Sequence, residues 1–171
     1  MNALGNIEIN NKNKKFIITD MNQMRVFLNN NNNLKESFIQ IIQEHKPDYN
    51  IEKLINDSKK ISNKITKFFI LYKKNTVVYI QRFVYMIKSN STYLDFIHTN
   101  AVYRKKGIAN ACLYFLISKT KNKFKTYNLK VRKDNYNAIK LYKNNNFKII
   151  SKIQQETNNK IIDVFIMKLS I

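Results

Sequence analysis

The segment Tyr93–Ile117 holds residues whose types and order could bind a phosphorylated ligand. A run rich in β-branched and aromatic residues leads into the basic turn Arg104-Lys105-Lys106-Gly107-Ile108-Ala109, and an amphipathic stretch follows directly. The first N–H groups of a helix have no partner within it and lie at the positive end of its dipole, so they attract anions. Gly107 allows the backbone to approach a phosphate closely, and small Ala109 leaves room for it. By themselves these residues are compatible with a pyrophosphate site, but a basic turn before a helix is more often a solvated loop, and one glycine is too few for a Walker or Rossmann loop.

Two separate blocks of the sequence share the spacing of a known family. The first is Arg104-x-x-Gly107-x-Ala109, and the second is Leu129-x-Val131-x-x-x-Asn135-x-x-Ala138-Ile139-x-Leu141-Tyr142-x-x-x-Asn146-Phe147. Together they resemble the two signature blocks of the GNAT N-acetyltransferase superfamily. The second block of that family normally ends in Gly-Phe, and here Asn146 replaces the glycine. This position is expected at a helix C-terminus, where asparagine is the next best residue at adopting a left-handed conformation.

The resemblance implies that the chain transfers the acetyl group of acetyl-CoA to a primary amine, by direct attack in a ternary complex. The acceptor is either a protein or peptide amine or a small-molecule amine. The resemblance also implies that backbone groups of Ile97 and Thr99 bind the pantetheine arm, that the main chain of residues 104–109 binds the pyrophosphate, and that Asn135 lies beside the cofactor. Tyr142 matches the tyrosine that protonates the departing CoA thiolate, a task that suits a phenol because it is neutral at pH 7 and can donate a proton.

Two residues are candidates for the base that deprotonates the amine, Asp95 and Tyr93. Alternate residues of a strand share a face, so we expect both on the face of Ile97, and His98 on the opposite face as a packed or surface residue. Asp95 occupies a position where many small-molecule acetyltransferases carry Glu, whereas Tyr93 resembles a tyrosine of protein N-terminal acetyltransferases. Those enzymes place a histidine on the next strand, where this chain has Lys130, and this difference counts against a peptide N-terminus. Asp95 is slightly favoured over Tyr93.

The composition limits the other classes of function. The formal net charge of +20 favours acidic partners, including nucleic acid, but lysine-rich and asparagine-rich usage is also typical of an AT-rich genome, so we expect any nucleic-acid binding to be non-specific. Cys112 is the only cysteine, which excludes an intramolecular disulfide and a Cys/His metal cluster, and we expect no metal. Met1–Lys15 lacks the apolar core of a signal peptide, and no apolar run approaches the roughly 20 residues that span a bilayer. We expect an intracellular, cytoplasmic protein without a membrane partner, and no feature predicts its oligomeric state.

The periodicity of apolar residues predicts a mixed α/β order in one domain over residues 1–171. The predicted strands are Lys15–Thr19, Ile65–Tyr72, Thr76–Lys88, Tyr93–Thr99, Tyr127–Val131, Phe147–Ile153 and Ile161–Leu169. The predicted helices are Met21–Leu28, a helix from about Leu34 that ends before Pro47, Ile51–Ile61, Ile108–Lys121 and Tyr136–Lys143. Asp20 and Gln23 form a capping-box pattern, so we expect Asp20 to cap the first of these helices. The resemblance implies the GNAT fold, a mixed sheet of six or seven strands flanked by helices. In that fold the strands predicted at Tyr93–Thr99 and Tyr127–Val131 splay apart, and the freed backbone groups bind the cofactor arm.

Overall fold

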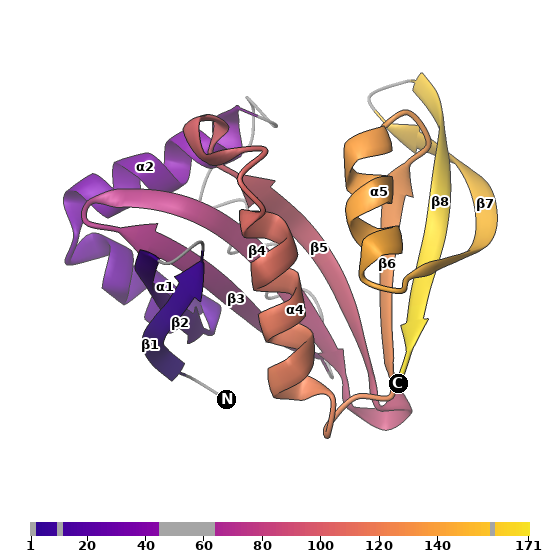
Figure 1. Cartoon of the computed structure of the whole chain (residues 1–171), viewed down its shortest axis with the longest axis horizontal. Helices are drawn as coiled ribbons and strands as arrows, with labels where there is room; N and C mark the ends of the chain where they lie inside the picture. Colours follow the sequence, from indigo (N-terminus) through magenta and orange to yellow (C-terminus); the bar gives the residue numbers. More distant parts are fainter. Residues whose placement is uncertain (1–2, 10–11, 45–63, 158–159) are drawn as a thin grey trace.

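The computed structural model describes residues 3–9, 12–44, 64–157 and 160–171 (Figure 1). Its strands form one eight-stranded sheet in the order β1-β2-β3-β4-β5-β6-β8-β7, antiparallel except between β5 and β6. The strands are β1 (Ala3–Ile9), β2 (Lys12–Thr19), β3 (Lys64–Lys73), β4 (Thr76–Met86), β5 (Ser91–Thr99), β6 (Thr126–Arg132), β7 (Lys148–Thr157) and β8 (Lys160–Ser170). The α-helices are α1 (Met21–Asn29), α2 (Asn32–Gln43), α4 (Ile108–Thr120) and α5 (Tyr136–Asn144).

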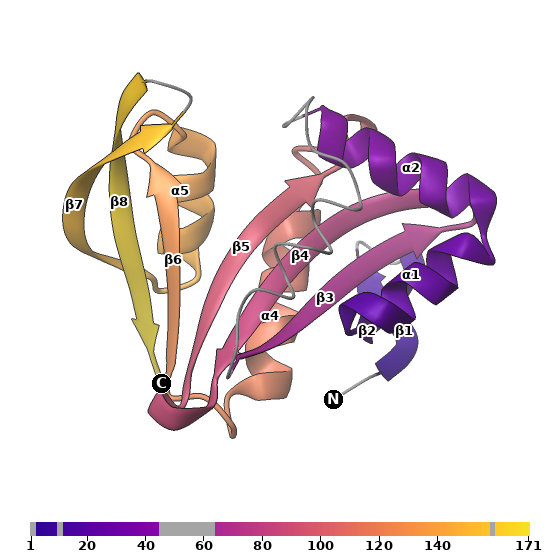
Figure 2. The same ribbon diagram turned by 180° about the vertical axis from the view of Figure 1, so that it is seen from behind.

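Two helices pack on each face of the sheet (Figures 1 and 2). The apolar sides of α1 and α2 pack on one face over β3, β4 and β5, and this cluster includes Phe38, Phe68 and Phe96. The opposite face carries α4 and α5, whose apolar residues join a larger cluster with Leu94 and Leu129. We call the first the α2 face and the second the α4 face.

A β-bulge at Phe96 changes which side chains of β5 share a face. In the register between β4 and β5, Arg82 pairs with Asp95 but Ile80 pairs with His98, so β5 has one extra residue. Phe96 has a φ of 55° and lies in the α2-face cluster, although alternation from Leu94 would place it on the α4 face.

Two predictions from strict alternation are therefore wrong. Asp95 does not share a face with Ile97, because Asp95 lies on the α2 face and Ile97 packs against the α4-face cluster. His98 lies on the α2 face together with Asp95. There the His98 ring packs edge-on against the Phe96 ring, with 4.8 Å between the ring centroids. The bulge thus separates the residues of β5 that can contact a ligand on one side of the sheet from those that can contact one on the other.

The parallel pair β5 and β6 separates after four residues. Pairing runs from Ser91 with Thr126 to Leu94 with Leu129 and then ends, and the two strands diverge toward the end that carries the N-termini of α4 and α5 (Figure 1). The backbone N–H and C=O groups beyond Leu94 on the facing edges therefore have no ladder partner across the gap. This is the splaying that the family resemblance implies.

The predicted fold class is confirmed, with small differences in the elements. The structure adds β1, which the sequence did not predict, and extends the strand predicted at Phe147–Ile153 to Thr157. Asp20 caps α1 as its pattern predicts, because its carboxylate accepts from the N–H of Gln23 at 3.0 Å. The helix predicted at Ile51–Ile61 lies outside the described residues.

Candidate active site

A cleft of about 780 Å³ occupies the gap between β5 and β6. Residues near the N-termini of α4 and α5 line it on the α4 face, among them Gly107, Ala109 and Ala138. Asp95 and Lys130 line it toward the α2 face. The cleft therefore passes through the sheet, so two ligands could enter from opposite sides and meet between the strands.

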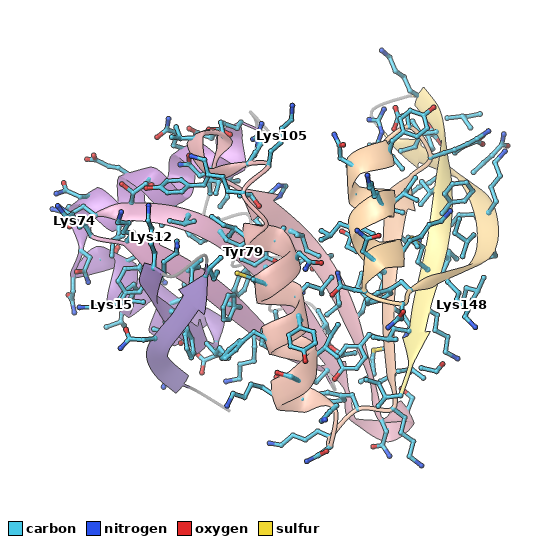
Figure 3. The ribbon with its side chains drawn as sticks, in the orientation of Figure 1. Lys12, Lys15, Lys74, Tyr79, Lys105 and Lys148 are labelled. Carbon is cyan, nitrogen blue, oxygen red and sulfur yellow. The ribbon has the colours of Figure 1, made fainter. Side chains whose placement is uncertain are left out.

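The turn before α4 leaves the first N–H groups of that helix available to an anion. Gly107 occupies the N-cap with a φ of 71°, and no side chain of the described residues caps the helix. A Cβ added at Gly107 would meet no atom within 4 Å, so its positive φ and not crowding by the protein favours glycine here, and the space in front of the helix is open. Lys105 also has a positive φ, 57°, and its side chain lies at the mouth of the cleft (Figure 3). This geometry fits a pyrophosphate.

The other two cations of the turn hold it in place. The guanidinium of Arg104 donates to the carbonyl of Thr99 at 3.0 Å and to the carboxylate of Glu44 at 2.7 Å, which links the turn to the end of β5 and to the end of α2. The Lys106 ammonium donates to the carbonyl of Val102 at 2.7 Å. Arg104 and Lys106 therefore stabilise the conformation of the turn, whereas Lys105 makes no such contact among the described residues.

Two of the expected cofactor-contacting residues of β5, Ile97 and Thr99, line the cleft beyond the last β5–β6 pair. Asn135 also lines it, but its side-chain oxygen accepts from the N–H of Ala138 at 3.1 Å and so caps α5. Its cap function explains why an asparagine suits this position independently of any ligand.

The C-terminus of α5 fixes the position of Tyr142. The N–H of Phe147 donates to the carbonyl of Tyr142, and the N–H of Asn146 to that of Lys143, both at 3.0 Å, which is a Schellman motif. Asn146 adopts the expected left-handed conformation with a φ of 64°, so that prediction is confirmed. The motif brings the rings of Tyr142 and Phe147 to a centroid distance of 5.9 Å and leaves Tyr142 only 7% exposed.

The electrostatics of the cleft keep the Tyr142 phenol protonated. Burial raises its pKa well above the usual value of 10, and the nearby Tyr93 and Asp95 raise it further. A buried, neutral phenol at the edge of the cleft is suited to donate a proton or a hydrogen bond.

On the α2 face, Asp95 forms an ion pair with Arg82. Two guanidinium nitrogens of Arg82 donate to the two carboxylate oxygens of Asp95 at 2.8 and 2.6 Å, and both side chains are mostly buried. A bidentate pair of this kind fixes the orientation of the carboxylate but leaves further lone pairs on its oxygens for another donor.

Tyr93 lies between this ion pair and β6. Burial is the main cause that raises its pKa to about 12, and the charge of Asp95 acts in the same direction. The backbone N–H of Lys130, one residue beyond the last β5–β6 pair, donates toward the phenol oxygen. With a pKa near 12, Tyr93 is protonated at neutral pH and is a weak base there.

Sequence reasoning missed Arg82 and misplaced His98, and both line the cleft. The Arg82–Asp95 pair joins neighbouring strands, and no local sequence motif predicts it. The bulge that turns His98 toward Asp95 occurs at a phenylalanine, a residue type that rarely has a positive φ, so the sequence gives no signal for it.

Comparison with known proteins identifies the class. The family model described as acetyltransferase (GNAT) family matches residues 33–147, which is more than half of the chain, and the chain therefore belongs to the GNAT acetyltransferase family. No curated protein matches the sequence.

Solved structures share the fold at low sequence identity. The ribosomal-protein-S18-alanine N-acetyltransferase from Escherichia coli is 20% identical with a TM-score of 0.65, and the match covers 100% of this chain and 94% of that one. An N-acetyltransferase from Staphylococcus aureus is 19% identical with a TM-score of 0.64, over 79% of this chain and 91% of that one. A GNAT family acetyltransferase from Elizabethkingia anophelis with acetyl-CoA bound is 15% identical with a TM-score of 0.59, over 77% and 89%.

Two further findings concern the described part of the chain only. Its helices include none that is both long and apolar enough to cross a membrane. Its histidine, cysteine, aspartate and glutamate side chains form no group of three or more that could hold a metal ion.

Proposed function

We propose that this protein is an acetyl-CoA-dependent N-acetyltransferase that acetylates a primary amine by direct attack in a ternary complex. The observation that carries this proposal is the cleft between β5 and β6, which passes through the sheet. An anion-binding helix N-terminus borders it on the α4 face, and a fixed carboxylate borders it on the α2 face. Cosubstrate and acceptor can thus approach from opposite faces, with no covalent intermediate on the protein.

On the cofactor side, the residues of this chain bind and orient. The N–H groups at the start of α4, opened by Gly107, bind the pyrophosphate, and Lys105 adds positive charge. The free edge of β5 at Ile97 and Thr99 binds the pantetheine amides in the manner of an added strand. Acetyl-CoA supplies the activated acetyl thioester when it is bound there.

On the reaction side, three residues can exchange a proton or a hydrogen bond with the reacting groups. Tyr142 keeps its proton because of burial and so can donate it to the departing sulfur. Asp95, oriented by Arg82, accepts a hydrogen bond from the incoming amine and is the proposed base. Tyr93 is protonated at neutral pH, so we propose that it hydrogen-bonds the amine rather than deprotonating it. Most of the rate enhancement in such a site comes from placing amine and thioester together.

The test is to incubate the purified protein with acetyl-CoA and a mixed panel of peptides and small amines, and to identify acetylated products by mass spectrometry. Acetylation of the amine of at least one acceptor, dependent on the protein, supports the proposal. Binding of acetyl-CoA without transfer to any acceptor would favour the alternative, a non-catalytic acyl-CoA-binding module on the same fold.

A further inference from the structure

Lysine side chains follow one face of the C-terminal strands from the cleft to the edge of the sheet. Lys168 of β8 pairs with Asn128 of β6, which lies two residues before Lys130 and so shares its face. Lys148 of β7 pairs directly with Lys168. Leu129, adjacent to Lys130, is buried in the α4-face cluster, so these lysines point to the other side of the sheet. We call Lys130, Lys168 and Lys148 the lysine track.

The track lies on a face of β6, β8 and β7 that no helix of the described chain covers (Figure 2). Lys148 lies at the outer edge of the sheet, far from the cleft (Figure 3). The acidic residues of β7 and β8, Glu156 and Asp163, occupy the alternate positions and face the other side. Among the described residues, none of the three track lysines forms an ion pair.

The inner end of the track lies at the proposed acceptor site. Lys130 lines the cleft, and its backbone N–H contacts the Tyr93 phenol. Among the residues that the structure describes, Asp95 is the one carboxylate residue that lines the cleft, and Arg82 already neutralises it. A cationic acceptor such as a polyamine would therefore meet net positive charge, whereas an amine followed by carboxylates would be attracted.

We propose that the acceptor is a polypeptide whose acetylated amine is followed by acidic side chains, and that the lysine track binds those side chains. This inference rests on the proposed function, and it replaces the expectation that Lys130 counts against a peptide N-terminus, because the lysine binds the peptide here and Asp95 is the proposed base. Diagonal neighbours on paired strands lie about 7–8 Å apart and direct neighbours about 5 Å apart, so the track is about 12–13 Å long. An extended chain advances about 3.3 Å per residue, so the track can contact roughly the first four residues that follow the amine.

The experiment measures the specificity of the full chain with peptides that share one N-terminal residue. Three long peptides differ in the four residues that follow: in one they are acidic, in one they carry side-chain amides, and in one they include arginine. Two dipeptides with the same first residue end in Asp or in Asn. The wild-type protein is compared with Lys130→Glu and with the double variant Lys168→Glu/Lys148→Glu. Lys15→Glu is the control, because this exposed lysine on β2 lies far from the cleft and its replacement changes the net charge by as much as Lys130→Glu does (Figure 3).

We expect the wild-type kcat/KM to be about tenfold higher for the acidic peptide than for the amide-bearing one, as several exposed ion pairs would give. Lys130→Glu should abolish or reverse this ratio, and the double variant should lower it for the long peptides but not for the dipeptides. Lys15→Glu should leave the ratio at its wild-type value.

Five results would overturn the inference, and only the last of them would overturn the proposed function as well. A wild-type ratio near one, or an equal effect of Lys15→Glu, would mean that no local recognition occurs. A preference confined to the dipeptides and insensitive to the double variant would indicate a small zwitterionic acceptor. Competition by single-stranded RNA that depends on the track, with no peptide preference, would make it a nucleic-acid surface. If the wild-type protein acetylates no amine of any kind, the proposed function fails as well; in the other cases it stands.

Discussion

Replacing Tyr142 by phenylalanine removes one hydroxyl group and little else. Its ring packs on Phe147 at a centroid distance of 5.9 Å, and a phenylalanine ring can keep that contact. No hydrogen bond among the described residues involves the Tyr142 hydroxyl. Deleting a hydroxyl that has no protein partner and borders an open cleft is nearly neutral for folding, so we expect the free energy of unfolding to change by less than about 1 kcal/mol.

The effect on catalysis should be much larger. A positioned general acid contributes about 10²- to 10⁴-fold, which corresponds to about 3–5 kcal/mol of transition-state stabilisation. We therefore expect the kcat of Tyr142→Phe to be about 10²- to 10⁴-fold lower than that of the wild type. The Kd for acetyl-CoA should stay within about twofold of the wild-type value. Initial rates of CoA thiol release give kcat, and titration calorimetry gives the Kd.

The matched control is Tyr114→Phe, because Tyr114 lies on α4 with 69% of its surface exposed and does not line the cleft. It should keep the wild-type kcat. An unchanged kcat in Tyr142→Phe would refute the assignment of Tyr142 as the acid, and a large loss of acetyl-CoA affinity would show that its hydroxyl serves binding.

Three further predictions follow from backbone conformation and burial. Gly107→Val should weaken acetyl-CoA binding at least tenfold, because the side chain both strains a φ of 71° and fills the space in front of α4; equal binding by calorimetry would contradict the pyrophosphate site. Asn146→Ala should destabilise the fold by about 1 kcal/mol, or about 2–4 °C in Tm, and Asn146→Gly should not; equal Tm values would show that the left-handed cap is unimportant. Burial raises the pKa of Tyr85 above its unfolded value near 10, so its contribution to stability is full below pH 10 and is lost as the pH rises further. Urea unfolding at pH 9 and pH 11 should therefore show that the free energy of unfolding falls less between these pH values in Tyr85→Phe than in the wild type. The titration of the lysines affects both proteins and cancels in this comparison, and equal falls would exclude a contribution from Tyr85.

The sequence predicts the elements that have strong local signals. Asp20 before α1 and Asn146 after α5 are capping residues whose preference is a property of a few adjacent positions, and both act as predicted. The strands beside them show apolar runs or β-branched enrichment. Ala3–Ile9 has only a weak pattern of this kind, and it becomes a strand because it pairs with β2.

The parts of the site that the sequence did not predict depend on contacts between distant residues. Because of the extra residue at Phe96, the side chains that follow it on β5 lie on the opposite faces from those that strict alternation predicts. Only the register with β4 shows this change. The Arg82–Asp95 and Arg104–Glu44 pairs join residues 13 and 60 positions apart. Such pairings depend on the tertiary arrangement and leave no periodic signal, so the glycine-containing turn before α4 could be predicted from the sequence whereas the Arg82–Asp95 pair on the other side of the cleft could not.

The central claim is that the gap between β5 and β6 is a specific acetyl-CoA site. The most direct test is the thermal shift of the purified protein with acetyl-CoA, CoA or ATP at matched ionic strength, since a ligand that binds only the native state raises Tm. We expect acetyl-CoA and CoA to raise Tm clearly more than ATP does, and Gly107→Val to remove the difference. Equal shifts with all three ligands would show that the lysines attract any phosphate, and no shift with acetyl-CoA would contradict the site.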